Sequence, residues 1–159
     1  MRLTGITAAA LILSLPGRSL AQEWIEYVNR AERFGVNLPG PPTVLETTYQ
    51  PQRGAALKAR VYRVQDGPRR YSVTVVDYAG ADPTDVRGSI AWETWNIRKR
   101  GGTITYDAFA QVDRIEGHEL HIINSDKTLT NVAIHLHARR LYILEATGPP
   151  NSPGALHFQ

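Results

Sequence analysis

The chain has 159 residues, no cysteine, and 18 lysines and arginines against 15 aspartates and glutamates, which gives a formal charge of +3. Without cysteine the fold cannot depend on disulfide bonds, so it must bury an apolar core of its own. The basic residues occur in short clusters, whereas nucleic-acid binding requires a sustained basic field interleaved with aromatic residues. The composition therefore argues against a nucleic-acid-binding protein.

The first 21 residues have the pattern of a secretory signal peptide. Arg2 supplies the positive charge, residues 6–15 form an apolar run, and residues 19–21 (Ser-Leu-Ala) fit the small-residue rule before a cleavage site. The apolar run is too short for a permanent membrane span. We therefore expect residues 1–21 to be removed and residues 22–159 to fold as one domain that is periplasmic or secreted.

Strand signals dominate the chain up to residue 78. Phe34, Val36 and Leu38 alternate with other residues, as on one face of a strand, and the prolines that follow end that strand. Residues 57–64 and 69–78 predict a hairpin, because Asp66-Gly67 between them supplies a residue that tolerates a positive φ. A further strand is predicted at residues 43–50. Residues 23–29 fit either a helix or a strand, and the strand is favoured because the alternating segment follows at once.

One strong helix is predicted between residues 82 and 102. Asp82 is placed to cap its N-terminus, and Pro83 occupies the first helical position, where its missing N–H costs nothing. Basic residues at 98–100 suit the negative end of the helix dipole, and Gly101-Gly102 stops the helix. Its apolar residues are interpreted as a packing face: Ile90, Ala91, Trp92, Trp95 and Ile97.

The rest of the chain predicts a meander of four antiparallel strands. They are expected at residues 103–115, 118–123, 129–137 and 141–147, with turns at 116–117, 124–127 and 138–140. Ser152 and Pro153 then predict the start of a second capped helix. It ends after one turn at Gln159 and would be marginal alone, so we expect the C-terminal helix to be truncated.

Histidines in the last strands form the candidate metal site. Pairing the apolar residues of 118–123 and 129–137 on one face sends Glu119, His121, His135 and His137 to the other face, an inventory that zinc accepts. The opposing interpretation is an ordinary hairpin face open to solvent. It is favoured because residues 137–139 are expected to form a turn, and because an outward face lacks the supporting partners that metal ligands need.

No other motif points to catalysis. The sequence lacks the known nucleophile-elbow, phosphate-loop, dinucleotide-binding and H-E-x-x-H patterns. The remaining acids and histidines are interpreted as ordinary surface or boundary residues: Asp77, Asp107, Asp113, Glu116, His118 and His157. We therefore predict no catalytic residues and no cofactor.

Several segments resemble exported bacterial proteins of the PsbP-like family, which has the fold of extrinsic subunit P of photosystem II and of the Ran-binding Mog-type proteins. They are "RFGVNLPGPP", "YSVTVVDY", the helix closed by "RGG", "DRIEGHEL", "RRLYILEATG" and "SPGALHF". The resemblance implies an α+β fold, an antiparallel β-sheet of about six or more strands with packed helices in an α/β/α sandwich. Members are mostly accessory and protein-binding modules, and no catalytic motif carries over.

Together these observations predict an exported, non-enzymatic binding or accessory protein. Its partner would be another protein or a small ligand, held at the sheet face or beside Trp92 and Trp95. Two alternatives stay open. One is a metal-binding protein or metal-dependent enzyme that uses the histidine and glutamate patch, and the other is a carrier of an apolar small molecule, which needs a cavity of suitable size.

Overall fold

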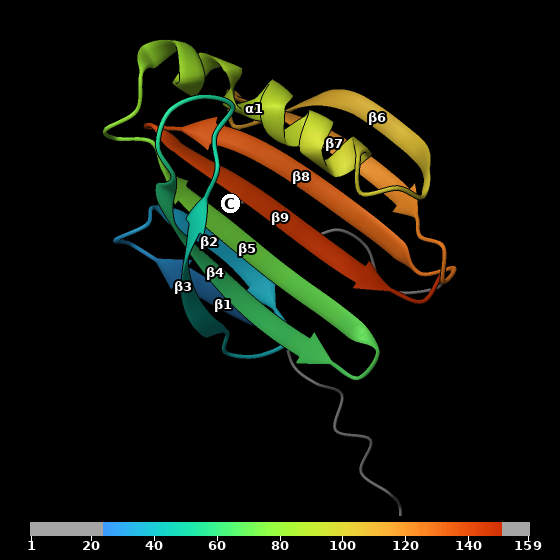
Figure 1. The fold of residues 1–159 in the computed structure, drawn as a ribbon. Helices are drawn as coiled ribbons and strands as arrows, with labels where there is room; N and C mark the ends of the chain where they lie inside the picture. The colour runs from blue at the N-terminus through green and yellow to red at the C-terminus, as the bar shows by residue number, and fades with distance from the viewer. Residues whose placement is uncertain (1–23, 151–159) are drawn as a thin grey trace, which may run out of the picture.

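The computed structural model describes residues 24–150, which contain nine strands and one α-helix (Figure 1). The predicted signal peptide and the predicted C-terminal helix lie outside these residues. The elements are β1 (Ile25–Asn29), β2 (Phe34–Leu38), β3 (Thr43–Tyr49), β4 (Leu57–Asp66), β5 (Arg69–Asp77), α1 (Pro83–Arg98), β6 (Thr103–Val112), β7 (Ile115–Ile123), β8 (Leu129–His137) and β9 (Arg140–Gly148).

Seven strands form one antiparallel sheet in the order β3-β4-β5-β9-β8-β7-β6. Short turns join most neighbours, and Gly67 supplies the positive φ of the β4–β5 turn, as predicted. The exception is the step from β5 to β6, where α1 carries the chain from the middle of the sheet to its far edge (Figure 1). The last strand, β9, then returns to pair with β5.

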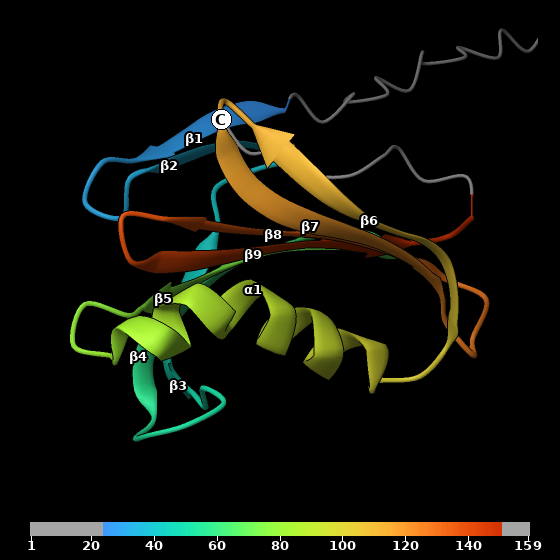
Figure 2. The same cartoon turned by 90° about the horizontal axis from the view of Figure 1, so that it is seen from above.

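The hairpin β1–β2 covers one face of this sheet, and α1 lies on the opposite face (Figure 2). Under the hairpin, Phe34, Val36 and Leu38 pack into a buried cluster with aromatic and aliphatic residues of β4, β5 and β9, among them Tyr142. The alternating pattern of residues 34–38 therefore marks a buried face, as expected. Tyr142 also donates a hydrogen bond to the backbone oxygen of Glu32, 2.8 Å away, which fixes the hairpin to β9.

Helix α1 has the ends that the sequence predicts. The Asp82 side chain accepts a hydrogen bond from the backbone N–H of Thr84 at 2.7 Å, and Gly101 and Gly102 adopt positive φ angles of 91° and 92° after the last turn. The helix packs through Ile97 onto a second buried cluster, formed by residues of β4, β5, β7, β8 and β9.

The predicted α+β class with helices packed on the sheet is wrong, because the described residues are mostly β with one helix. The expected antiparallel sheet is present, but its second face is covered by the two-stranded β1–β2 hairpin where a helical layer was expected. The physical reason is connection length: apart from α1, the described strands are joined by segments too short or too irregular to contain a helix.

Two smaller predictions also need correction. The turn between β6 and β7 lies at Asp113 and Arg114, both with positive φ, and not at residues 116–117. Trp92 and Trp95 do not form the packing face of α1. They stack on each other on the outer side, with ring centroids 4.8 Å apart, and Trp95 is 44% exposed.

The helix found in residues 24–150 is neither long nor apolar enough to cross a membrane.

Candidate functional site

A groove of about 740 Å³ lies between α1 and the β6–β7 hairpin. Ile90, Ala91 and Thr94 form the helix side, and Phe109 and His118 belong to the strand side. Arg87, Arg98 and Glu116 place charges on the lining, while the area between them is largely apolar. The volume is within the range of natural small-ligand pockets.

Three charged or titratable groups are joined at one side of this groove. Arg98, in the last turn of α1, donates two hydrogen bonds to Asp107 of β6, from Nε to Oδ2 at 2.8 Å and from Nη2 to Oδ1 at 2.7 Å. Nε2 of His118 lies 2.6 Å from Oδ1 of the same carboxylate. These contacts tie the end of the helix to the edge of the sheet.

The charge state of Asp107 follows from its partners. The Arg98 guanidinium, assisted by His118, lowers the pKa of the Asp107 carboxyl to about 2. Asp107 is therefore ionised at neutral pH and accepts a hydrogen bond from Nε2–H of His118, which fixes the orientation of the imidazole. His118 itself is only 7% exposed.

Phe109 is the most exposed large apolar residue of the described chain, at 89%. Its ring meets the His118 ring edge-to-face, with centroids 5.3 Å apart and an angle of 77°. Phe109 lies on β6, the last strand of the sheet order, so one side of this strand is not paired within the described residues. The groove therefore combines an exposed aromatic ring, a fixed polar group and an open strand edge.

Local sequence explains why these groups meet. Gly101 and Gly102 reverse the chain directly after α1, so Arg98 faces the following strand. A Cβ atom at Gly102 would lie 2.8 Å from the Ile123 backbone oxygen, which makes this close approach possible only for glycine. The two-residue turn between β6 and β7 then sets Phe109 directly opposite His118.

The arrangement of side chains in the groove is better suited to binding a partner than to catalysing a reaction. His118 is oriented by a carboxylate, as a general base would be, but a nucleophile would have to lie beside it. The hydroxyl that lines the groove belongs to Thr94, and it donates a hydrogen bond to the backbone oxygen of Ile90 at 2.8 Å. Its proton is thus engaged within the helix.

The residues of the predicted metal site lie on the face of the sheet opposite to the groove. The register of β7 and β8 agrees with the predicted one, so Glu119, His121, His135 and His137 share a face. The expected turn at residues 137–139 is wrong in one respect: Ala138 and Arg139 form it, and His137 remains in β8, paired with Arg140.

The expectation that this face is open to solvent is wrong at His135, which is 1% exposed. Its imidazole lies against Gly117, the residue opposite it on β7: a Cβ atom there would come within 2.3 Å of Nδ1. Burial lowers the pKa of His135. Across residues 24–150, no group of three or more His, Cys, Asp or Glu side chains is arranged to hold a metal ion.

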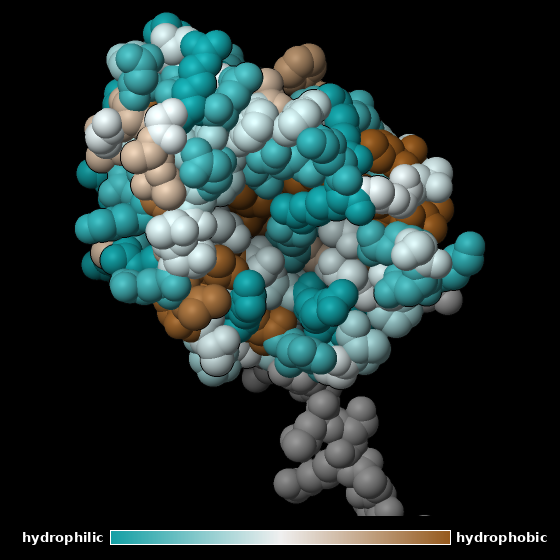
Figure 3. Space-filling view, in the orientation of Figure 1, coloured by the Kyte–Doolittle hydropathy of each residue, from teal (hydrophilic) through white to brown (hydrophobic). Residues whose placement is uncertain are grey.

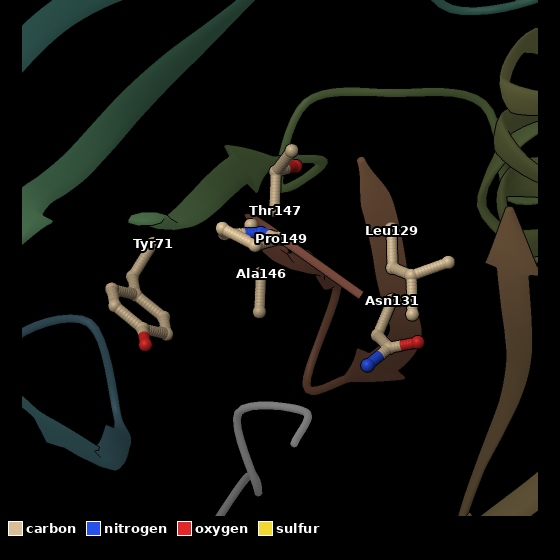
Figure 4. Close-up of a pocket in the computed structure, with 7 residues that line it drawn as sticks. Tyr71, Leu129, Asn131, Ala146, Thr147 and Pro149 are labelled. Carbon is tan, nitrogen blue, oxygen red and sulfur yellow. The ribbon is translucent and has the colours of Figure 1, made fainter. Parts of the chain in front are cut away.

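Two further hollows are less suited to a ligand. One of about 310 Å³ beside the β1–β2 turn is lined by charges of both signs, and its buried acid, Glu32, already pairs with Arg60 and Arg140. The other, shown in Figure 4 with Tyr71, Asn131 and Ala146 on its lining, measures about 20 Å³ and holds no more than a water molecule.

Sequence reasoning missed the groove residues. From the sequence alone, Asp107 and His118 are interpreted as ordinary surface or boundary residues, since nothing in the sequence pairs them. The turn expected at residues 116–117 does not bring them together either. The usable signal was Asp113-Arg114: a turn there makes His118 and Phe109 opposite partners and brings Asp107 to the diagonal position.

Comparisons with known proteins complete this description. No family model matches the chain, and no curated protein matches it. Among solved structures, a proposed regulator of unknown function from Pseudomonas aeruginosa is 12% identical, with a TM-score of 0.38, over 66% of this chain and 83% of that one. These comparisons assign no family. At this score the likeness carries no argument, and it does not concern the PsbP-like family.

Proposed function

We propose that the protein is an exported binding module that holds an extended, apolar segment of another protein in the groove between α1 and β6–β7. The single observation that carries this proposal is Phe109, 89% exposed at the rim of the groove on an edge strand. Export itself rests on the sequence of residues 1–21 and is tested by N-terminal sequencing of the secreted protein, which should begin at Gln22.

The open edge of β6 favours a partner in extended conformation. An unpaired strand edge presents backbone N–H and C=O groups, and natural proteins usually protect such edges with charge, proline or bulges. β6 has one irregularity, between Ile104 and Tyr106, and its only charged residue, Asp107, is held by Arg98. Added strands bind to edges of this kind through main-chain hydrogen bonds.

The side chains around this edge favour an apolar partner. Aromatic residues exposed on a surface are frequent anchors of protein interfaces, because their burial removes a large apolar area from water at low cost in side-chain entropy. Phe109 is held against His118, whose imidazole is fixed by Asp107. The anchor is therefore supported before a partner arrives, which reduces the ordering cost of binding.

A peptide selection tests the proposal. A random library of peptides the length of β6, 10 residues, is selected on the immobilised protein, and the selected peptides are measured against Phe109→Ala. We expect enrichment of apolar residues and at least about a tenfold loss of affinity in the variant. The matched control is Leu45→Ala, which removes a half-exposed apolar residue from the opposite edge strand, β3.

The binding mode has its own readout. Methylating alternate main-chain nitrogens of a selected peptide removes the donors that pair with a strand edge, and should abolish binding in one of the two alternations. Equal affinity for Phe109→Ala and the unchanged protein, or equal loss in Leu45→Ala, would show that the groove is not the binding surface.

A further inference from the structure

The face of the sheet that carries α1 is divided by the helix into two regions. On one side lies the groove with β6 and β7, and on the other side the sheet surface of β4, β5 and β9 is left open (Figure 1). This open surface contains a shallow hollow of about 770 Å³, here called the arginine basin. Figure 3 views the molecule from this side; hydrophilic side chains cover much of the surface, and apolar side chains lie deeper in the hollow near its centre.

Pairing between the strands establishes which residues share the arginine basin. Arg63 of β4 lies opposite Ser72 of β5, which lies opposite Glu145 of β9. Arg100, just after α1, donates a hydrogen bond to Glu145 at 2.7 Å, so this row of side chains faces the helix side of the sheet. Arg70 is two residues from Ser72 on the same strand and therefore points to the same face.

The charges in the arginine basin do not balance. Glu145, its acidic lining residue, is already paired with Arg100. Within residues 24–150, neither Arg63 nor Arg70 forms an ion pair. Asp126, in the β7–β8 turn, interacts with the charge of Arg70 but forms no ion pair with it. Both guanidinium groups therefore remain available to a ligand in a concave site.

The spacing of these two arginines suits one ligand. Arg63 and Arg70 occupy diagonal positions on neighbouring antiparallel strands, where side chains start about 7 Å apart. Long arginine side chains from such positions can converge on a single group between them. The hydroxyl of Ser72 also lines the basin and can donate a hydrogen bond to the same group. The Thr43 hydroxyl, by contrast, donates to the backbone oxygen of Arg63 at 3.3 Å, and the Thr147 hydroxyl is paired with that of Thr130 at 2.9 Å.

From this arrangement we propose that the arginine basin binds a small divalent oxyanion, a dicarboxylate or a phosphate monoester, clamped between Arg63 and Arg70. Guanidinium groups bind carboxylate and phosphate through paired, charge-assisted hydrogen bonds. A cation would meet two unpaired positive charges. An apolar ligand would give the two guanidinium groups no partner. The site is separate from the peptide groove, because the two hollows share no lining residue.

Calorimetric titration of the full chain with inorganic phosphate and with succinate, at equal ionic strength and slightly alkaline pH, tests this proposal. We expect saturable binding of one anion per chain, weakened at least about tenfold by Arg63→Ala and by Arg70→Ala. Arg53→Ala removes the same charge from an exposed loop and should bind as the unchanged protein does. The relative affinities for phosphate and succinate distinguish the two sources of the oxyanion.

Two results would overturn the proposal: no saturable binding of either anion, or an equal loss in the control variant, which would indicate attraction by net charge alone. Arg63→Lys refines the test, since it keeps the charge and loses the paired geometry. It should weaken binding by less than Arg63→Ala does. Circular dichroism melting of each variant separates loss of binding from loss of fold.

Discussion

The hydroxyl of Tyr49, at the end of β3, donates a hydrogen bond of 2.8 Å to the carboxylate of Glu93, which is buried on the inner side of α1. Glu93 is 3% exposed and also accepts hydrogen bonds from Asn96 and Arg100. One charged residue thus connects the helix to the first strand of the sheet. It also places a carboxylate inside the protein, where its charge is costly.

The cost of this burial should be visible in the pH dependence of stability. Burial raises the pKa of Glu93 despite its hydrogen bonds, so folding disfavours its charged form. The free energy of unfolding is therefore lower at neutral pH, and it rises as the pH falls toward the pKa of glutamate in the unfolded chain, about 4.3. We expect the melting temperature of the unchanged protein to rise relative to Glu93→Gln between pH 7.5 and pH 4.5, a shift that differential scanning calorimetry measures. A difference that is constant with pH would contradict this.

Asp107 should show the opposite dependence. Its pKa is lowered to about 2, first by Arg98 and then by His118, so its ionised form stabilises the fold. This contribution is present above the unfolded-state pKa, about 3.9, and disappears as the pH falls through the folded-state value. Urea unfolding should show Asp107→Asn less stable by about 1 to 2 kcal/mol at pH 7, after allowance for solvent screening.

The control for this prediction is Asp113→Asn, in the exposed β6–β7 turn, where asparagine tolerates the positive φ of 49°. It should change stability by less than about 0.5 kcal/mol. Near pH 2.5, between the two pKa values, the gap between Asp107→Asn and the unchanged protein should have narrowed to about a third of its size at pH 7. A gap of the same size at pH 7 and pH 2.5 would mean that Asp107 acts through packing and not through its charge.

Gly117 should tolerate no side chain. A Cβ atom at this position would lie 2.3 Å from Nδ1 of His135 and 2.5 Å from the backbone oxygen of Ile134. Gly117→Ala must therefore displace a buried imidazole or the neighbouring strand, at a cost of about 1 to 3 kcal/mol. Thermal melting measures the loss. Gly80→Ala is the matched control, because nothing lies within 4 Å of a Cβ there; equal melting temperatures for the two variants would be incompatible with this contact.

Local signals explain why much of the fold could be predicted from the sequence. The ends of α1 depend on Asp82, Pro83 and the two glycines after it, and all of these act on adjacent backbone groups. The β4–β5 hairpin depends on Gly67, and the meander follows from alternating apolar residues. Such features need no knowledge of distant residues.

The predictions that were wrong concern contacts between residues far apart in the sequence. The sequence predicts Trp92 and Trp95 on the packing face, but the inner face of α1 carries Glu93, whose partner Tyr49 is 44 positions away. Nothing near Glu93 in the sequence indicates that its carboxylate will accept a hydrogen bond from a tyrosine hydroxyl. The covering of the second sheet face by a hairpin is likewise set by the packing of Phe34, Val36 and Leu38.

The groove residues could not be predicted for a more specific reason. Arg98, Asp107 and His118 come together only if the β6–β7 turn is placed at Asp113 and Arg114. A turn placed three residues later changes which side chains are opposite each other, and the three then look unrelated. The metal patch, by contrast, was given the correct register, but the burial of its central histidine depends on long-range packing.

Phe109 should contribute almost nothing to stability, although it is a large aromatic residue. Since its ring is 89% exposed, Phe109→Ala removes little buried area and should change the free energy of unfolding by less than about 0.5 kcal/mol. Leu120, on the neighbouring strand β7, is 0% exposed, and Leu120→Ala should cost about 2 to 5 kcal/mol. Chemical denaturation of both variants measures the contrast. A loss above about 1.5 kcal/mol for Phe109→Ala would mean that the ring serves the fold, and would remove the reason for treating it as a binding anchor.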